Sequence, residues 1–226
     1  MKNNKPDLLD FLAEASKRGT RVPSIPELSE QLGMNVAAVR EQLEVARQLG
    51  IVEVKPKVGI QLHAFDLSKP LGMCLKYGLS VEPDLFDHFA DLRRHLEMSY
   101  WYEAVPKLTR KDIEVLQAIV DAALAKIRQQ PVEIPLDEHR DLHLLIYRHL
   151  DNPIVISMLE TYWDLYSQTA ASRYYDRDSL EVIWVQHQKM VSALAARQFE
   201  QGFEVMVAHM DLLQSVKKAE INQRFE

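Results

Sequence analysis

The sequence has a single cysteine among its 226 residues, so one chain cannot form an internal disulfide, which suits a reducing cytoplasm. It has no uninterrupted apolar run of about 20 residues, the length that spans a bilayer. Its first residues, MKNNKPDLLD, lack the apolar core of a signal peptide. An excess of basic residues is missing too, since the net charge is −6, which argues against wholesale coating of nucleic acid. We therefore expect a cytoplasmic protein that does not enter a membrane.

The charge is nevertheless unevenly distributed. Residues 1–65 carry nine Lys and Arg against eight Asp and Glu, whereas the rest of the chain is acidic. A near-neutral front joined to an acidic body is compatible with a small DNA-reading module on a larger acidic domain.

The first 65 residues show the order of a winged helix-turn-helix. An amphipathic helix over 6–18 is followed by a short helix with a Ser24–Glu27 capping box, and by a third helix that Asn35 can cap. The stretches IVEV and IQLH then alternate as two strands around the turn KPKVG. The third helix would enter the major groove, and the wing would bring Lys55 and Lys57 to phosphates. The alternative is a small packing unit whose basic hairpin is merely solvated.

Beyond a linker and connecting helix at 66–79, no strand pattern remains, and residues 80–226 are predicted to be helical. Long helices joined by short connections indicate an antiparallel bundle. The expected fold is therefore mostly α, an N-terminal winged helix-turn-helix followed by an all-helical bundle. The helical patterns cover about 67–78, 82–104, 110–129, 135–150, 153–173 and from about 179 to the end.

The stretch DEHRDLHLLIYRHL, residues 137–150, holds three histidines. His139 and His143 are four residues apart and lie roughly 40° apart on one helix face, where two side chains can meet one ion. His149 lies roughly 240° around from His143 and cannot join them. The alternative is an amphipathic helix whose polar residues happen to be histidines.

Two parts of the chain resemble a known family. The phrase PSIPELSEQLGMNVAAVREQLEVARQLGIVEVKPKVG resembles the DNA-binding domain of the GntR family of bacterial transcription regulators. The stretches DLRRHLE, HRDLHLLIYRHLDNP and HQKMVSALAARQFEQGFEVMVAH resemble the helical ligand-binding domain of its FadR branch, the FCD domain. The resemblance covers nearly the whole chain in consistent order.

The resemblance implies a divalent metal held by one Asp and three His. The histidines correspond to His143, His187 and His209, while His139 stands at the Asp position. Four neutral imidazoles would favour Zn²⁺, or else Ni²⁺, over Mg²⁺ or Ca²⁺. Shared coordination by His187 and His209 requires a chain reversal near residues 197–199, where periodicity alone predicts one long helix. The alternative is four unrelated polar positions.

The resemblance also implies an effector, a small organic acid that completes the metal coordination. Arg93, in the R-x-x-L-E pattern with Glu97, would pair with its carboxylate, and Arg173 is a weaker candidate of the same type. The alternative for Arg93 is a structural i, i+4 pair with Glu97. The aromatic residues Trp101 and Trp163 are assigned to the core.

On the DNA side this chain departs from the family pattern. Ser24-Ile25-Pro26 stands where the family has Ser-Glu-Arg, and Asn35-Val36 stands where it has Ser-Arg. Two arginines that reach bases or phosphates in the family are therefore absent, and the operator should differ from the family consensus. The remaining candidate DNA contacts are Asn35, Arg40, Lys55, Lys57 and His63.

These observations predict a transcription regulator, a dimeric repressor on a palindromic double-stranded DNA operator, whose DNA affinity a small carboxylic acid alters. Two alternatives stay open. A His-rich site with an open position can activate water in an enzyme, although the sequence has no H-E-x-x-H and no obvious general base. The metal of the bundle can also be purely structural.

Overall fold

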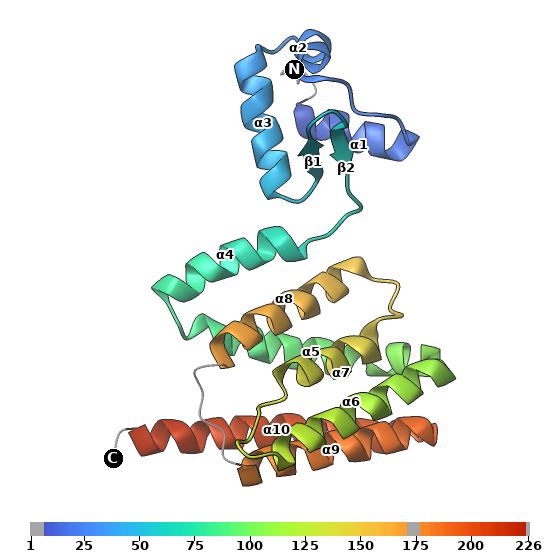
Figure 1. Cartoon of the computed structure of the whole chain (residues 1–226), viewed down its shortest axis with the longest axis vertical. Helices are drawn as coiled ribbons and strands as arrows, with labels where there is room; N and C mark the ends of the chain where they lie inside the picture. Colours follow the sequence, from blue (N-terminus) through green and yellow to red (C-terminus); the bar gives the residue numbers. More distant parts are fainter. Residues whose placement is uncertain (1–6, 171–176, 225–226) are drawn as a thin grey trace. The chain divides into compact units, whose positions relative to one another are not determined.

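The structure is a computed structural model that describes residues 7–170 and 177–224. The chain divides into two compact units, Met1–Tyr77 and Gly78–Glu226. The elements, shown in Figure 1, are α1 (Leu8–Arg18), α2 (Ile25–Leu32), α3 (Val36–Gln48), β1 (Val52–Lys55), β2 (Gly59–Leu62), α4 (Ser68–Val81), α5 (Leu85–Ala104), the 3₁₀ turn η1 (Val105–Lys107), α6 (Arg110–Arg128), α7 (Leu136–Tyr147), α8 (Pro153–Ala170), α9 (Arg177–Ala195) and α10 (Phe199–Arg224). The predicted class, a winged helix followed by a helical domain, is confirmed. None of the described helices is both long and apolar enough to cross a membrane.

Local capping signals determine where the first helices begin. Ser24 and Glu27 form the predicted capping box of α2, and the Asn35 side chain accepts the Ala38 amide at 2.8 Å at the start of α3. The apolar positions of these helices share a core with the wing; that core includes Leu8, Leu12, Leu28, Val39, Leu43, Val52 and Ile60. The three helices and the wing therefore form a packed unit of their own.

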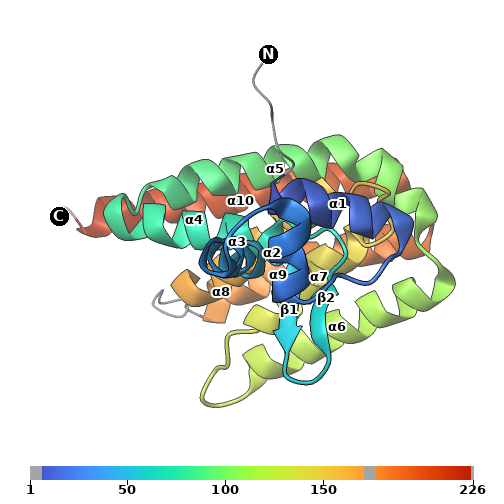
Figure 2. The same cartoon turned by 90° about the horizontal axis from the view of Figure 1, so that it is seen from above.

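The wing is a two-stranded antiparallel hairpin. Val52 pairs with Leu62 and Lys55 pairs with Gly59, so the turn lies at residues 56–58. Val52 and Ile60 point into the core, while the alternate positions are more exposed. Figure 2 shows the two strands side by side with the turn at their free end.

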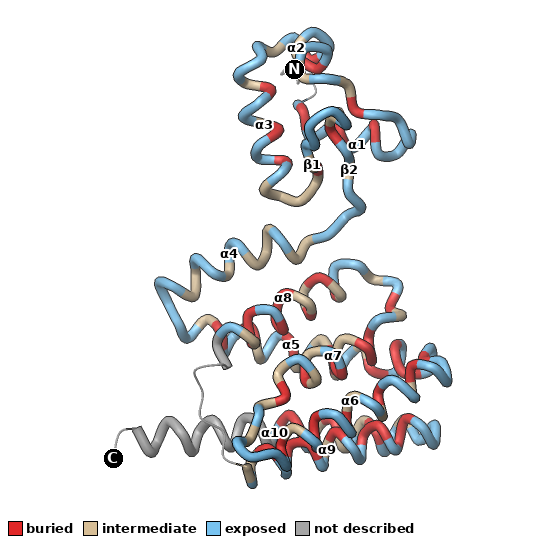
Figure 3. Tube along the Cα trace, in the orientation of Figure 1, coloured by how far each residue is buried: buried red, intermediate tan, exposed pale blue. Residues whose placement is uncertain are grey.

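The second unit contains the larger core, built from α5 to α10. The tube in Figure 3 shows buried positions concentrated along these helices, whereas α4 has no buried residue. Three fully buried tryptophan side chains, those of Trp101, Trp163 and Trp184, lie in this unit. The helix over 110–129 was predicted within a residue, because the predicted capping box of Thr109 with Asp112 starts α6.

The single long helix that periodicity predicts from about 179 to the end is wrong. The chain instead forms α9 and α10, which Figure 1 shows side by side and which pack closely on each other. Arg197, between them, has φ 57°, in the left-handed region. The reversal that the resemblance implied is therefore present at residues 196–198.

Candidate metal centre and DNA-binding face

Four histidine side chains from three helices meet inside the second unit. His139 and His143 lie one turn apart on α7, His187 lies on α9 and His209 lies on α10. One ring nitrogen of each lies within 4.8 Å of the others, and all four residues are between 0% and 6% exposed. The three histidines named by the resemblance come together, and His139 joins them. His149, as expected from its angle, is not part of the group.

The turn between α9 and α10 brings the last two histidines together. The Gln198 amide donates to the Ala193 carbonyl at 2.8 Å and closes the turn around Arg197. As a result the ring centroids of His187 and His209 are 4.3 Å apart. In one continuous helix these residues would be roughly 33 Å apart.

Gly202 lets α10 approach α5 closely. A Cβ at this position would lie 2.9 Å from Cζ2 of Trp101, which is nearer than such atoms pack. Trp101 is fully buried, and its indole N–H donates to the Phe199 carbonyl at 3.0 Å. His209 follows Gly202 by seven residues, about two turns, on the same side of α10. The close approach at Gly202 therefore helps to place the His209 ring.

One pair of histidine nitrogens is spaced as two ligands of one ion would be. Nε2 of His143 and Nε2 of His187 are 3.2 Å apart. Two nitrogens bound at about 2.1 Å in a tetrahedral site are about 3.4 Å apart. Nε2 of His139 and both ring nitrogens of His209 are buried with no hydrogen-bond partner among the described residues. A metal ion would satisfy these nitrogens, so the donor set fits one.

Burial keeps the four imidazoles neutral. It lowers the pKa of all four below the ordinary value of histidine, and the positive charge of Arg93 adds to the effect. The pKa of His187 falls to about 3. Neutral imidazole is the form that coordinates a metal, so the site needs no proton release before an ion binds.

A buried ion pair lies against the histidines. Nε of Arg93 donates to Oε1 of Glu97 at 2.8 Å, and these side chains are 4% and 0% exposed. Oε2 of Glu97 lies 3.2 Å from Nδ1 of His143, and a terminal nitrogen of Arg93 lies 2.9 Å from the same atom. Burial raises the pKa of Glu97, and the adjacent guanidinium partly offsets this effect. The sequence left the Arg93–Glu97 pair as an alternative to effector binding by Arg93. It did not predict that this pair contacts His143.

Aromatic rings line the histidine cluster. Trp163 stacks on His143, with centroids 4.8 Å apart, and lies 4.6 Å from the Arg93 guanidinium carbon. Trp184 packs on His187 at 4.7 Å. Trp163 was predicted to lie in the core, and it is fully buried. Nothing in the spacing of the sequence predicted that it also lines the histidine cluster.

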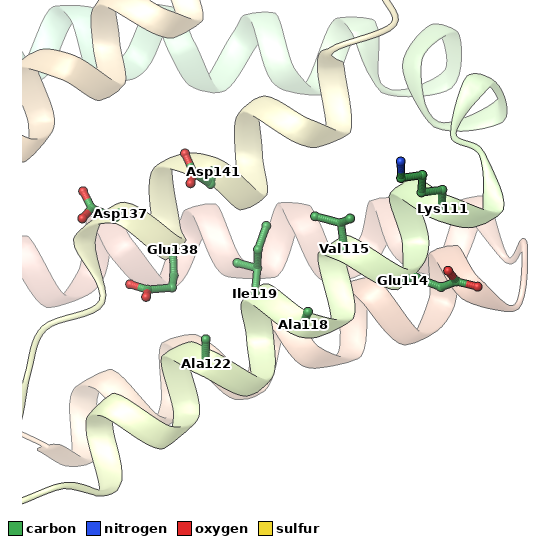
Figure 4. Close-up of a pocket in the computed structure, with 9 residues that line it drawn as sticks. All are labelled: Lys111, Glu114, Val115, Ala118, Ile119, Ala122, Asp137, Glu138 and Asp141. Atoms are coloured by element: carbon green, nitrogen blue, oxygen red, sulfur yellow. The ribbon is translucent and has the colours of Figure 1, made fainter.

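The neighbouring acidic residues of α7 do not supply the carboxylate that the family places at position 139. Asp141 is exposed and pairs with Arg140 at 3.0 Å. Together with Asp137 and Glu138 it lines a surface hollow between α6 and α7, shown in Figure 4, that none of the four histidines lines. Arg173, the weaker effector candidate, lies outside the described residues.

The predicted DNA contacts lie on the surface of the first unit. Arg40 on α3 is exposed and forms no ion pair with any residue that the structure describes. Lys57 is at the tip of the wing, with φ 64°. Lys55 and His63 are less free, because Glu53 lies 3.0 Å from the Lys55 ammonium and 3.7 Å from Nε2 of His63. Asn35 uses its side-chain oxygen to cap α3.

Comparison with known proteins identifies the helical unit. Residues 88–212 match the FCD domain. The chain belongs to the FCD domain family. Since these residues contain the four histidines and Arg93, the candidate metal centre lies within the FCD domain. The resemblance to the FadR branch of the GntR family, stated from the sequence, is confirmed.

Two sequence relatives support this placement. The chain is 26% identical over 216 residues to the HTH-type transcriptional regulator LutR of Bacillus subtilis, covering 88% of this chain and 92% of LutR. It is 23% identical over 199 residues to the Uxu operon regulator of Haemophilus influenzae, covering 85% of this chain and 72% of that regulator. Both relatives carry the names of regulators, which argues against the enzyme alternative.

Solved structures share the fold over nearly the whole chain. The GntR protein of Streptococcus agalactiae has a TM-score of 0.64 at 15% identity, covering 91% of this chain and 96% of that one. McbR/YncC of E. coli has a TM-score of 0.53 at 20% identity and covers 96% of both chains. The chain therefore has the fold of a GntR-family transcription regulator.

Proposed function

We propose that this FCD protein is a dimeric transcription repressor that senses a small organic acid through a metal held by four histidines. The observation that carries the proposal is the buried cluster of His139, His143, His187 and His209, whose ring nitrogens lie within 4.8 Å of one another. When bound, the metal would supply a Lewis acid to which an anionic ligand can bind. The effector and the DNA then act on one protein at two sites.

The donor set favours a transition metal. Four neutral nitrogen ligands suit Zn²⁺ or Ni²⁺, whereas Mg²⁺ and Ca²⁺ prefer oxygen. Glu97, 3.2 Å from Nδ1 of His143, is placed to orient that ring, as carboxylates beside metal-bound histidines do. Its negative charge also offsets the charge of Arg93, so the pair adds no net charge to the centre.

Arg93 is the residue that would hold the effector carboxylate. Only its Nε is used by Glu97; its terminal nitrogens lie near the Met210 sulfur, at 3.6 Å, and the His143 ring. These N–H groups can turn to an incoming carboxylate, and in this buried setting such a charge-assisted bond is strong. Arg93 would therefore bind and orient the acid beside the histidines.

Effector binding would change DNA affinity through the connecting helices. α4 crosses the boundary between the two units, and the short segment 82–84 joins it to α5, which carries both Arg93 and Glu97. The ligand can act only by its difference in affinity between two arrangements of the dimer. Two copies of α3 would then bind half-sites of a palindromic operator about one helical turn apart, with Arg40 and the wing lysines at the DNA.

The metal is tested by elemental analysis of the full chain. Wild-type protein and His95→Ala, which removes an exposed histidine of α5, should each carry about one ion per chain. His143→Ala and His187→Ala should lose it while keeping their helical content. If all four proteins bind equal amounts, or if the wild type binds none, the four-histidine site is wrong.

The regulation is tested by titrating the full chain with DNA from its own upstream region, with and without chelator and a panel of carboxylic acids. The wild type should bind this DNA sequence-selectively, and an acid should change its affinity. The affinity of Arg93→Met should not respond to the acid. If the wild type binds metal but no acid changes its DNA affinity, the metal is only structural. The absence of any sequence-selective DNA binding would rule out the proposed role as a transcription regulator.

A further inference from the structure

The first turn of α3 exposes two apolar side chains where a DNA-reading helix would carry polar ones. Val36 is 38% exposed, and Ala37 is exposed beside it. The preceding residue, Asn35, has its side-chain oxygen committed to the helix cap. The end of α3 that would lead into the groove therefore presents methyl groups.

These side chains are grouped with the free arginine of the helix. At 100° per residue, Arg40 lies roughly 40° from Val36 and 60° from Ala37, between the two. By the same measure Leu43 lies roughly 20° from Val36, so the buried residues Val39, Leu43 and Ala46 form the adjoining side of α3, which packs into the core of the first unit, and Val36 stands at its edge. One ligand can contact Val36, Ala37 and Arg40 together. They offer it two apolar side chains with one cation between them.

We propose that Val36 and Ala37 read the methyl groups of thymines in the major groove, next to a base or phosphate bound by Arg40. The inference rests on the proposed function, in which α3 lies in that groove. Among the base-pair edges in the major groove, only that of thymine carries a methyl group. An apolar side chain against any other edge would bury a donor or acceptor without a partner, which is unfavourable.

An operator read in this way should differ, at the positions that face Val36 and Ala37, from one read by an arginine. An arginine at this position would select guanine through two hydrogen bonds. The Val36 side chain forms no hydrogen bonds, so it favours a base that offers an apolar contact. The half-site should therefore contain thymine at one or two positions beside the base that faces Arg40. The discrimination per position is smaller than that of a bidentate arginine, because one methyl contact is worth about 0.8 kcal/mol.

The test starts with selection of duplexes from a random library by the full chain, followed by replacement of each thymidine by deoxyuridine. The replacement removes only the methyl group and keeps base pairing. The expected result is a loss of affinity of about four-fold at one or two positions of each half-site, the factor that corresponds to one methyl contact. Positions elsewhere in the selected duplex should show no change.

Val45 provides the matched control on the same helix. It is also an exposed valine, at 54%, and lies nine residues on, roughly on the opposite side of α3 from Val36. In Val36→Ala the effect of the thymine methyl should shrink below two-fold, whereas Val45→Ala should keep the full effect.

The outcomes separate this inference from the proposed function. If no duplex is enriched, the protein does not read DNA and the proposed function fails. If a duplex is enriched but deoxyuridine binds as well as thymidine at every position, methyl reading fails and DNA binding stands. Equal loss of the methyl effect in Val36→Ala and Val45→Ala would likewise overturn it.

Discussion

Replacing Asp112 by Asn should destabilise the helical unit by about 2 kcal/mol at pH 7. Asp112 is 5% exposed and joins the start of α6 to the end of α7. Its Oδ2 accepts the Thr109 hydroxyl at 2.6 Å and lies 2.9 Å from Nε2 of His149, while Oδ1 accepts from Arg148 at 3.3 Å. Since α7 carries His139 and His143, this anchor also supports the metal centre.

The magnitude follows from the pKa of the Asp112 carboxyl. Burial acts to raise this pKa, but the hydrogen bonds from Thr109 and the contact with His149 outweigh burial and lower it from 3.8 to about 2. Since each pKa unit is worth about 1.4 kcal/mol, this lowering of the pKa corresponds to about 2 kcal/mol. Because the folded-state pKa is depressed, this stability is present above pH 4 and is lost as the pH falls toward 2. About half of it should remain at pH 3.

Urea unfolding followed by tryptophan fluorescence measures this effect. All three tryptophans, Trp101, Trp163 and Trp184, lie in the helical unit, so the signal is specific to it. Asp121→Asn, at an exposed aspartate of the same helix, is the control and should change stability by less than about 0.5 kcal/mol. The reasoning is refuted if the Asp112→Asn difference is equal at pH 7 and pH 3, or if it matches the control.

Three further predictions concern packing, buried charge and DNA contact. Gly202→Ala should lower the stability of the helical unit by about 1–2 kcal/mol, because the added Cβ meets the fully buried Trp101 ring; unchanged urea midpoints would contradict this. Glu97→Gln should cost about 3–5 kcal/mol, because it leaves Arg93 as an uncompensated buried charge, and the double variant with Arg93→Met should recover most of the loss in a double-mutant cycle. Lys57→Ala should weaken binding to all duplexes alike and reduce the slope of log affinity against log salt by about 1; a change in base preference would count against a phosphate contact.

Much of the fold was predictable because its signals are local. The capping boxes of Ser24 with Glu27 and of Thr109 with Asp112, and the cap at Asn35, each involve residues three apart in the chain. Such contacts form wherever the segment lies, so the helices they start were placed correctly from the sequence. The wing was predictable for the same reason, since its strands are neighbours along the chain.

The centre was predictable only in part. His139 and His143 lie one turn apart, so their spacing alone placed them on one face. His187 and His209 could be joined to them only through the family resemblance, because the turn between α9 and α10 contains no proline or glycine and depends on Arg197 adopting a left-handed conformation. The contacts of Glu97 and Trp163 with His143 had no signal at all.

The sequence by itself determined which segments are helical, where most of them begin, the winged helix, and the pairing of two histidines on one helix face. These follow from interactions between residues a few positions apart. Only the tertiary structure decided that four histidines share one buried site, that an Arg–Glu pair lies against it, and that Val36 remains exposed on α3. Those facts depend on contacts between helices far apart in the chain, where packing rather than spacing sets which side chains meet.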